Sequence, residues 1–432
     1  MRRETIAPSD RTLTPSDWTL APPPRRPIGP YMRTQVGIIG AGPAGLLLGH
    51  LLHLNGIDSV IVENRSREYV IDRVRAGVLE QGTVDLLNAM GVGAGLRRAG
   101  LRHDGLYVSF QGRRHRINLA DLTGGKAITV YGQNEVVHDL IEARTAIARP
   151  LYFEAEHVSV GDLDSSSPVV RFTHGDTQHE VHCDVIAGCD GFHGICRQSI
   201  PDGVLKIYER IYPFGWLGIL AEVPPSCDEL VYTCHERGFA LFSMRSSKIT
   251  RLYFQVPPDE PIEHWSDDAI WQEMLTRMTT TDGWSPTVGR IIQKGVTPMR
   301  SFVAAPMRFG RLFLAGDAAH IVPPTGAKGL NLAASDVLVL ARALKAFYER
   351  GRTEWLDEYS DVCLRRVWKA QRFSWWMTST LHRSPDENAF DHQRQIADLD
   401  YLTSSHAAMT SLAEQYVGLP SEVSFESVGL HT

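Results

Sequence analysis

Three glycines between positions 40 and 45 have the spacing of a dinucleotide-binding turn. The segment G-A-G-P-A-G fits G-x-G-x-x-G, in which Gly40 permits the tight turn, Gly42 lets a pyrophosphate approach the backbone and Gly45 lets helix and strand pack closely. Glu63 follows about twenty residues later, where an acidic side chain can accept hydrogen bonds from a ribose. The pattern therefore predicts a bound dinucleotide, but it does not distinguish FAD from NAD.

The residues around this turn predict the βαβ unit that such a site needs. Residues 35–39 (Q-V-G-I-I) form an apolar run typical of a buried strand, and the leucine-rich stretch after Gly45 predicts a helix that ends at the Asn-Gly pair 55–56. Residues 59–63 (S-V-I-V-E) predict a second buried strand. The order of strand, glycine turn, helix and strand places Glu63 close to the turn.

Two acidic turns follow later in the chain, each after an apolar run. Residues 184–191 (D-V-I-A-G-C-D-G) end at Asp190 and Gly191, and residues 311–320 (R-L-F-L-A-G-D-A-A-H) carry Asp317 at a predicted helix start. Each segment alone could be a strand-ending turn without any function. Their order after the glycine turn is the more specific signal.

The pattern changes in the middle of the chain and again near its end. Residues 205–300 contain aromatic and β-branched runs such as L-V-Y-T, G-F-A-L-F-S and R-L-Y-F-Q-V, broken by Pro and Gly, which predict an antiparallel sheet in a separate lobe. Beyond Gly329 the sequence is largely helical. We find no internal repeat of the solenoid type.

Composition excludes some classes of function. The 432 residues carry a net charge of −6 with acidic and basic side chains well mixed, so nothing indicates a nucleic-acid-binding surface. The six cysteines have no C-x-x-C spacing and are expected to be reduced thiols, without a metal site. Because the chain has neither an apolar run long enough for a membrane span nor a signal-peptide core, we expect a cytoplasmic protein.

The ordered trio of motifs resembles the class A flavoprotein aromatic hydroxylases. Further segments are similar to members of that family that act on 4-hydroxybenzoate, and the similarity extends from about Met32 to Pro420. These segments are residues 73–82 (R-V-R-A-G-V-L-E-Q-G), 131–133 (Y-G-Q), 212–218 (Y-P-F-G-W-L-G) and 320–331 (H-I-V-P-P-T-G-A-K-G-L-N).

The resemblance implies a mixed α/β fold with FAD threaded through the glycine-turn domain. Residues 1–31, which are rich in proline, are expected to be a disordered extension that is dispensable for activity. Residues 32–206 and 300–335 would form the FAD-binding domain, residues 207–299 the substrate-binding sheet lobe, and residues 336–432 a helical interface region. The family further suggests a homodimer.

The resemblance also assigns residues to the cofactor. Asp317 would bind the ribityl chain of FAD, Asp190 would serve both FAD and the nicotinamide coenzyme, and the loop from Pro323 to Asn331 would lie against the isoalloxazine. The implied FAD-binding residues are Gly40, Gly42, Gly45, Glu63, Arg75, Gln133, Asp190, Asp317, Gly329, Leu330 and Asn331. The residues that match the coenzyme's pyrophosphate site are His193, Arg197, Arg75 and Arg300.

Coenzyme preference stays open because this sequence departs from the family pattern. Relatives that prefer NADPH have an arginine where this chain has Asn64. Arg65 or Arg67 could replace it, since either guanidinium can reach a nearby phosphate. NADPH and NADH are therefore both retained as electron donors.

For the substrate, the resemblance implies two groups of residues. Ser243, Arg245 and Tyr253 would bind a carboxylate, because a planar guanidinium flanked by hydroxyl groups satisfies such an anion. Without the resemblance, Arg245 would be assigned to the surface and Tyr253 to the core. The residues implied at the hydroxyl end are Tyr232 and Tyr416 as a proton route leading to His103, Pro324 and Thr325 beside the hydroxyl, and Lys328 as a source of positive potential.

The implied reaction is hydroxylation of 4-hydroxybenzoate to 3,4-dihydroxybenzoate with O₂ and a reduced nicotinamide coenzyme, through a flavin C4a-hydroperoxide. Deprotonation of the substrate hydroxyl makes the ring electron-rich enough to accept the oxygen. Two alternatives remain open at this point. One is a related hydroxylase for another hydroxybenzoate, and the other is a flavin-binding regulatory module without catalytic activity.

Overall fold

The computed structural model describes residues 32–73 and 77–430. The expectations for residues 1–31 and for Arg75 lie outside the described residues. The FAD-binding domain is built on a six-stranded sheet whose central strands are parallel, as the glycine-turn motif predicts. In order across the sheet these strands are β19 (Arg308–Phe309), β20 (Leu312–Leu314), β13 (Val185–Gly188), β2 (Val36–Ile39), β3 (Ser59–Val62) and β9 (Leu151–Tyr152).

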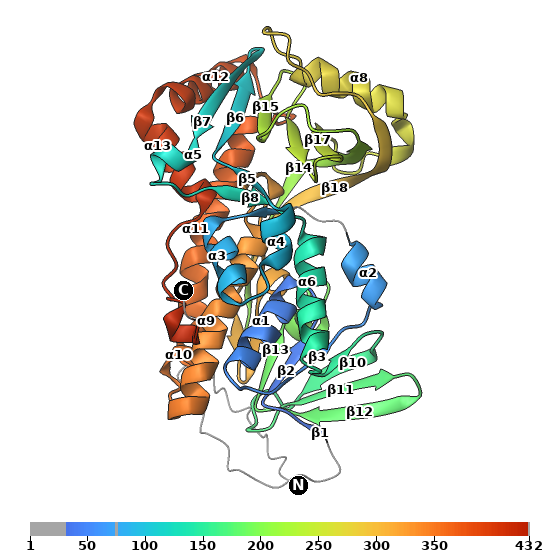
Figure 1. Cartoon of the computed structure of the whole chain (residues 1–432), viewed down its shortest axis with the longest axis vertical. Helices are drawn as coiled ribbons and strands as arrows, with labels where there is room; N and C mark the ends of the chain where they lie inside the picture. Colours follow the sequence, from blue (N-terminus) through green and yellow to red (C-terminus); the bar gives the residue numbers. More distant parts are fainter. Residues whose placement is uncertain (1–31, 74–76, 431–432) are drawn as a thin grey trace, which may run out of the picture.

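The central strands are apolar throughout because both of their faces are covered. Every residue of β2, β3 and β13 is buried, which is typical of a parallel sheet with helices packed on it. Helix α1 (Pro43–Leu54) lies between α6 (Gln133–Ala146) and α9 (Gly329–Arg350) in front of the sheet (Figure 1). The predicted strands at 35–39 and 59–63 and the helix between them are confirmed.

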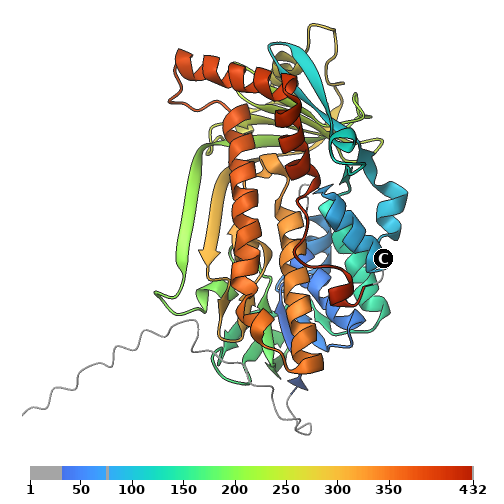
Figure 2. The ribbon, with the colours of Figure 1, turned by 90° about the vertical axis from the view of Figure 1, so that its left-hand side faces the viewer.

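The lobe that is expected to bind the substrate is built on an eight-stranded sheet. Its two longest strands pair antiparallel along nearly their whole length and run between the lobe and the FAD-binding domain (Figure 2). In order the strands are β21 (His320–Ile321), β18 (Arg290–Ala305), β14 (Lys206–Glu222), β17 (Thr250–Val256), β16 (Ala240–Met244), β15 (Val231–Cys234), β6 (Gly105–Phe110) and β7 (Arg113–Asn118). Because β21 pairs with β18, the sheet begins at the segment that follows Asp317.

Parts of this lobe differ from the sequence-based expectation. The three predicted runs form β15, β16 and β17, but two strands from the first third of the chain, β6 and β7, extend the same sheet. A helix, α8 (Asp267–Met278), lies within the region expected to be sheet, and Ser266 caps its N-terminus. Strand β6 pairs with β15 across more than a hundred residues of sequence, a contact that no local pattern encodes.

The remaining elements complete both parts. The smaller sheets are formed by β1 (Met32–Arg33), β12 (Thr177–His182), β11 (Val169–His174) and β10 (Glu156–Gly161), and by β4 (Val78–Leu79), β8 (Ile128–Val130) and β5 (Leu101–His103). The other helices are α2 (Arg67–Asp72), α3 (Gln81–Ala89), α4 (Ala94–Ala99), α5 (Leu119–Leu122), α7 (Ile195–Gln198), α10 (Glu354–Asp357), α11 (Tyr359–Leu381), α12 (Ala389–Ser404) and α13 (His406–Val417).

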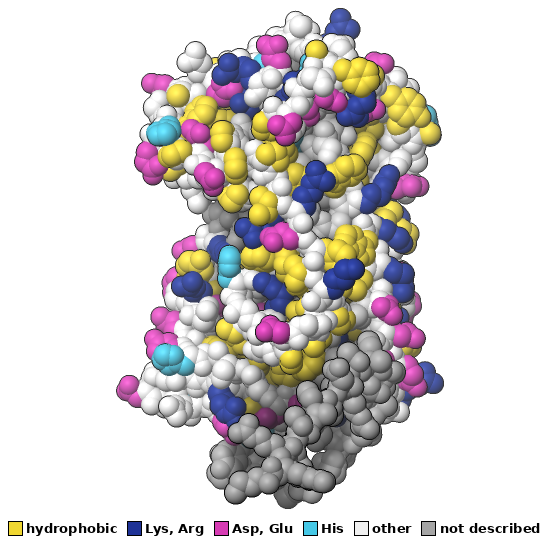
Figure 3. Space-filling model, turned by 180° about the vertical axis from the view of Figure 1, so that it is seen from behind, with side chains coloured by type: hydrophobic (Ala, Val, Ile, Leu, Met, Phe, Trp, Pro, Cys, Tyr) yellow, Lys and Arg dark blue, Asp and Glu magenta, His cyan; other side chains and the backbone are white. Residues whose placement is uncertain are grey.

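The C-terminal helices connect the two parts, as the helical pattern beyond Gly329 predicts. Helix α11 runs along the FAD-binding domain and reaches the lobe (Figure 2). Seen from behind, basic and acidic side chains are interspersed and the molecule narrows between lobe and domain (Figure 3). Within residues 32–73 and 77–430, no helix is both long enough and apolar enough to span a bilayer.

Candidate active site

The glycine turn between β2 and α1 has a shape that only glycine permits. Gly40 has a φ of 103°, and a Cβ there would lie 2.3 Å from the carbonyl oxygen of Cys189. A Cβ on Gly45 would lie 2.0 Å from the carbonyl oxygen of Gly40. A Cβ on Gly42, in contrast, would meet nothing within 4 Å, so the N-terminus of α1 is open to an approaching group. This open turn at a helix start fits the pyrophosphate of FAD.

Acidic side chains surround the turn. Glu63 follows β3 directly, and its carboxylate accepts hydrogen bonds from the backbone N–H groups of Ala41 and Arg65, both at 2.8 Å. These bonds fix the carboxylate beside the turn and leave lone pairs for a ribose hydroxyl. Asp317 is the one exposed residue between positions 311 and 320. An exposed carboxylate in a buried segment fits a polar chain such as the ribityl group.

Asp190 has an oxygen that needs a further partner. Its Oδ2 accepts a hydrogen bond from the backbone N–H of Cys196 at 2.8 Å. Its Oδ1 is buried and has no partner among the described residues, and burial raises the pKa of this carboxyl. Buried polar atoms in native proteins are almost always paired. The orphaned oxygen therefore fits a site that is completed by a bound group.

The residues matched to the coenzyme's pyrophosphate gather around one aromatic ring. The guanidinium carbons of Arg197 and Arg300 each lie 4.8 Å from the centre of the Phe192 ring, and the exposed His193 is the next residue in the chain. Arg197 also donates to the carbonyl of Ala318 at 2.8 Å, beside Asp317. Sequence reasoning missed Phe192, although its place directly after the Asp-Gly turn was available as a signal.

Arg65 and Arg67 contact other residues than the members of this cluster. Arg65 stands 5.3 Å from the centre of the Tyr69 ring, and Arg67 forms an ion pair with Glu142 at 2.5 Å. Asn64 is exposed. Gln133 is the first residue of α6, so its backbone lies at a helix N-terminus.

The carboxylate-site candidates lie on neighbouring strands of the lobe. Tyr253 of β17 pairs with Leu241 of β16, and Leu241 pairs with Tyr232 of β15. Paired residues share a face of the sheet, and Ser243 lies two residues beyond Leu241 on that face. Tyr232, Ser243 and Tyr253 therefore line one surface. This arrangement brings the two proposed ends of the substrate site together.

Arg245 directly follows β16 and reaches toward the FAD-binding domain. Its guanidinium donates a hydrogen bond to the side chain of Asn134, which is next to Gln133 in α6. Burial lowers the pKa of Arg245, and the charge of Arg251 lowers it further. Sequence reasoning missed Arg251, whose guanidinium carbon lies 4.9 Å from the Tyr253 ring centre. Two guanidinium groups in a partly buried place favour an anion.

The hydroxyl-end candidates form a buried hydrogen-bonded chain. The hydroxyl oxygens of Tyr232 and Tyr416 lie 2.5 Å apart, and either can be the donor. Tyr232 also donates to the backbone carbonyl of Thr325 at 3.2 Å, whereas the carbonyl of Pro324 accepts from the N–H of Ala327 at 2.9 Å. Burial raises the pKa of both tyrosines, so both are neutral near neutral pH.

His103 is buried at the end of β5 and is not a surface histidine. Its Nε2 lies 2.9 Å from the sulfur of Met244, and its Nδ1 has no partner among the described residues. Burial lowers the pKa of His103 to about 4. No hydrogen bond within the described part of the chain joins it to Tyr232 or Tyr416, so its place in the proton route stays a prediction.

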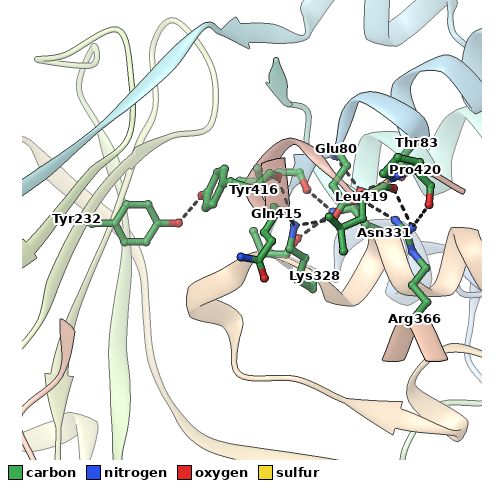
Figure 4. A network of polar contacts seen from close by, with 12 residues as sticks. Glu80, Thr83, Tyr232, Lys328, Asn331, Arg366, Gln415, Tyr416, Leu419 and Pro420 are labelled. Atoms are coloured by element: carbon green, nitrogen blue, oxygen red, sulfur yellow. Dashed lines mark hydrogen bonds and ion pairs between the residues drawn. The ribbon is translucent and has the colours of Figure 1, made fainter. Parts of the chain in front are cut away.

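The loop after Asp317 is held by a buried polar network (Figure 4). Asn331 accepts hydrogen bonds from the backbone of Glu80 at 2.9 Å and from the hydroxyl of Thr83 at 2.8 Å. Lys328 forms an ion pair with Glu80 at 2.6 Å and donates to the carbonyls of Gln415 and Tyr416. Gly329 and Leu330 begin α9. The network links this loop to the helix that carries Tyr416.

Comparison with known proteins identifies the family of this chain. The family described as "FAD binding domain" matches residues 33–374. The chain is 53% identical over 392 residues to p-hydroxybenzoate hydroxylase of Acinetobacter baylyi, covering 91% of this chain and 97% of that protein. It is 28% identical to 6-methylpretetramide 4-monooxygenase of Streptomyces rimosus, over 72% of this chain and 75% of that one.

Solved structures show the same fold. The crystal structure of p-nitrophenol 4-monooxygenase from Pseudomonas putida superposes with a TM-score of 0.75 at 18% identity, covering 93% of this chain and 100% of that one. The resemblance drawn from the motifs is confirmed by the family match and by the 53% identical relative. The chain therefore belongs to the class A flavoprotein hydroxylases, within the family that shares the FAD-binding domain.

Proposed function

We propose that this enzyme hydroxylates 4-hydroxybenzoate to 3,4-dihydroxybenzoate, using FAD, O₂ and a reduced nicotinamide coenzyme. The observation that carries the proposal is the sheet face on which Tyr232, Ser243 and Tyr253 lie together. At one end of this face stand the guanidinium groups of Arg245 and Arg251, and at the other end the hydroxyl pair of Tyr232 and Tyr416. Such a site suits a ring with a carboxylate and a hydroxyl group on opposite sides.

Each group has a defined task in this proposal. FAD held by the glycine turn, Glu63, Asp190 and Asp317 would supply the redox chemistry, namely hydride acceptance from the coenzyme and activation of O₂. Arg245 and Ser243 bind the carboxylate and orient the ring. The hydroxyl of Tyr232 turns from the carbonyl of Thr325 to Tyr416, accepts the substrate's phenolic proton and donates its own proton to Tyr416. Tyr416 in turn gives up its hydroxyl proton along the route that is predicted to lead to His103, so no proton accumulates on the pair. Loss of the phenolic proton makes the ring a better nucleophile.

The surroundings protect this chemistry from water. Tyr232 and Tyr416 are each 2% exposed and Thr325 is 0% exposed, so bulk water does not reach the hydroxyl pair. A dry site strengthens the hydrogen bonds and charges within it. We further propose that Phe192, Arg197, Arg300 and His193 form the coenzyme site, since two cations and a ring suit a pyrophosphate with an attached nicotinamide.

The testing experiment is product identification with the purified FAD enzyme. Incubation with 4-hydroxybenzoate, O₂ and NADH or NADPH should give 3,4-dihydroxybenzoate, detected by chromatography. The same measurement with a panel of other hydroxybenzoates separates this proposal from a related hydroxylase. Flavin that is not reduced faster in the presence of any of these acids would contradict the proposal and favour a regulatory module.

We also propose that two copies associate and that the protein is cytoplasmic. Helices α11 and α12 expose large apolar side chains, among them Trp375, Phe390 and Tyr401, and a second copy of this face would cover them. The six cysteines are unpaired thiols, which is the state favoured in a reducing compartment. Light scattering gives the mass in solution, and a monomer at all concentrations would contradict the homodimer.

A further inference from the structure

One buried carboxylate, Glu80, is shared by two cations. Its Oε1 lies 2.6 Å from the ammonium of Lys328, and its Oε2 lies 3.0 Å from the guanidinium of Arg366. Glu80 and Lys328 are 5% and 4% exposed, so water screens their charges only slightly. Arg366 comes from α11, on the opposite side of the carboxylate from Lys328 (Figure 4). The three side chains together carry a formal charge of +1.

This excess positive charge lies close to Tyr416, one member of the hydroxyl pair. Lys328 donates to the backbone carbonyl of Tyr416 at 3.3 Å and to that of Gln415, and its ammonium lies 5.8 Å from the centre of the Tyr416 ring. The Tyr416 hydroxyl is in turn 2.5 Å from that of Tyr232. The other cation on this side, the exposed Arg372, donates to the side chain of Gln415.

Without Arg366, the pair of Lys328 and Glu80 would be electrically neutral. A neutral ion pair produces only a weak potential beyond its immediate contacts, because the two opposite charges nearly cancel with distance. The guanidinium of Arg366 neutralises the carboxylate from its far side and restores the excess positive charge. Burial lowers the pKa of Lys328, whereas Glu80 at 2.6 Å raises it and favours the ammonium form. The charge of Arg366 also lowers the pKa of Lys328, but its effect is the smallest of these.

We propose, on the basis of the proposed function above, that Arg366 is a positioning residue whose charge balances Glu80 and leaves the positive charge of Lys328 available to favour the ionised substrate phenol. Its other contacts are with the chain that follows Tyr416. Arg366 donates to the backbone carbonyls of Leu419 at 2.9 Å and Pro420 at 3.5 Å. Its contacts reach the site through Glu80 and through this segment, and its charge also acts on Lys328.

The test is a titration of the phenol of 4-hydroxybenzoate bound to the FAD enzyme, followed by the absorbance difference between phenol and phenolate. Arg366→Gln removes the charge but keeps a donor for the two carbonyls. We expect the midpoint to rise by roughly half a unit to one unit, the scale of removing one partly buried charge beyond contact distance. Arg366→Lys keeps the charge, so its midpoint should stay near that of the unaltered enzyme.

Arg365 provides the matched control. It is the preceding residue of α11 and pairs with Glu422 on the surface, where both side chains are about half exposed. Arg365→Gln should leave the midpoint unchanged, because solvent screens this pair. An equal shift in Arg365→Gln and Arg366→Gln would show a general effect of helix charge and would overturn the proposal.

A double variant separates charge from tethering. Glu80→Gln with Arg366→Gln leaves Lys328 as the sole charge, so its midpoint should lie near that of the unaltered enzyme and above that of Glu80→Gln alone. This comparison also serves if Arg366→Gln by itself loses flavin. Substrate affinity that falls while the midpoint stays constant in every Arg366 variant would show a tether only, and the inference would be wrong. Failure of the unaltered enzyme to bind 4-hydroxybenzoate would instead contradict the proposed function.

Discussion

Replacement of Arg245 by alanine tests the carboxylate end of the proposed site. The guanidinium lies in a partly buried place where its own pKa is already lowered by desolvation, so a bound carboxylate there would depend on this partner. Removing one member of a buried ion pair costs about 3–5 kcal/mol. Because Arg251 stays nearby as a second cation, we expect a cost about 1 kcal/mol smaller than this range, about 2–4 kcal/mol.

This energy corresponds to a dissociation constant for 4-hydroxybenzoate that is about 30-fold to about 1,000-fold higher. The assay is a titration of the flavin absorbance or fluorescence with substrate, together with the flavin content of the purified variant. The dissociation constant of Arg245→Lys should lie between those of the unaltered enzyme and of Arg245→Ala, because an ammonium keeps the charge but loses the planar two-donor geometry. FAD should stay bound in both variants.

Arg290→Ala is the control, since Arg290 lies in the same lobe but forms an exposed ion pair with Glu222. Its effect on substrate affinity should be within about twofold, as for most surface pairs. A dissociation constant for Arg245→Ala that is no higher than that of this control would refute the reasoning. Arg245 would then serve only its contact with Asn134 at the boundary between lobe and FAD-binding domain.

Three further changes follow from the site. Tyr232→Phe should lower the amount of aromatic product formed per coenzyme oxidised at least about tenfold, while flavin reduction still responds to substrate. An unchanged ratio of product to coenzyme would exclude Tyr232 from the proton route. Asn64→Arg should shift the coenzyme preference toward NADPH by on the order of tenfold, because it adds one charge-assisted contact to the 2′-phosphate. The measurement is kcat/KM for both coenzymes, and no change would show that residue 64 lies away from that phosphate. Asp336→Asn should lower the melting temperature, more at about pH 6 than at about pH 9.

The pH dependence of the last change follows from the buried pair of His320 and Asp336, whose atoms lie 2.6 Å apart. Burial alone would lower the pKa of His320, but the charge and hydrogen bond of Asp336, with a smaller effect of Asp317, raise it above its ordinary value. Stability from such a histidine is fully present below the unfolded pKa of about 6.5 and is lost as the pH rises through the folded pKa. An equal decrease in melting temperature at both pH values would contradict this account.

The glycine turn could be predicted because its constraints are local. Gly40 and Gly45 are required by close backbone approach within one turn, Gly42 keeps the start of the helix open, and the strands on either side are recognisable as apolar runs. The strands that carry Tyr232, Ser243 and Tyr253 were also visible, since each is a short β-branched and aromatic run. The mutual placement of these residues came from the family resemblance and not from periodicity.

Residues that act through distant contacts could not be predicted in this way. Glu80 and Arg366 are 286 positions apart, and nothing in the sequence near either one indicates the other. By their position in the sequence, strands β6 and β7 would be assigned to the first domain, but β6 pairs with β15 of the lobe. Arg251 and Phe192 lie beside residues that were singled out, but a single arginine or phenylalanine is by default a surface or core residue.

The arrangement of the proposed site predicts that mutation can separate substrate binding from hydroxylation. Ser243 and Tyr253 come from two adjacent strands of the lobe and Arg245 directly follows one of them, so the proposed carboxylate end is built by the lobe sheet. The hydroxyl end needs Tyr232 from that sheet, Tyr416 from α13 and the carbonyl of Thr325 from the loop after Asp317. Only this end contacts all three parts of the molecule. Changes in the C-terminal helices should therefore affect the ionisation of the bound phenol more than the binding of its carboxylate.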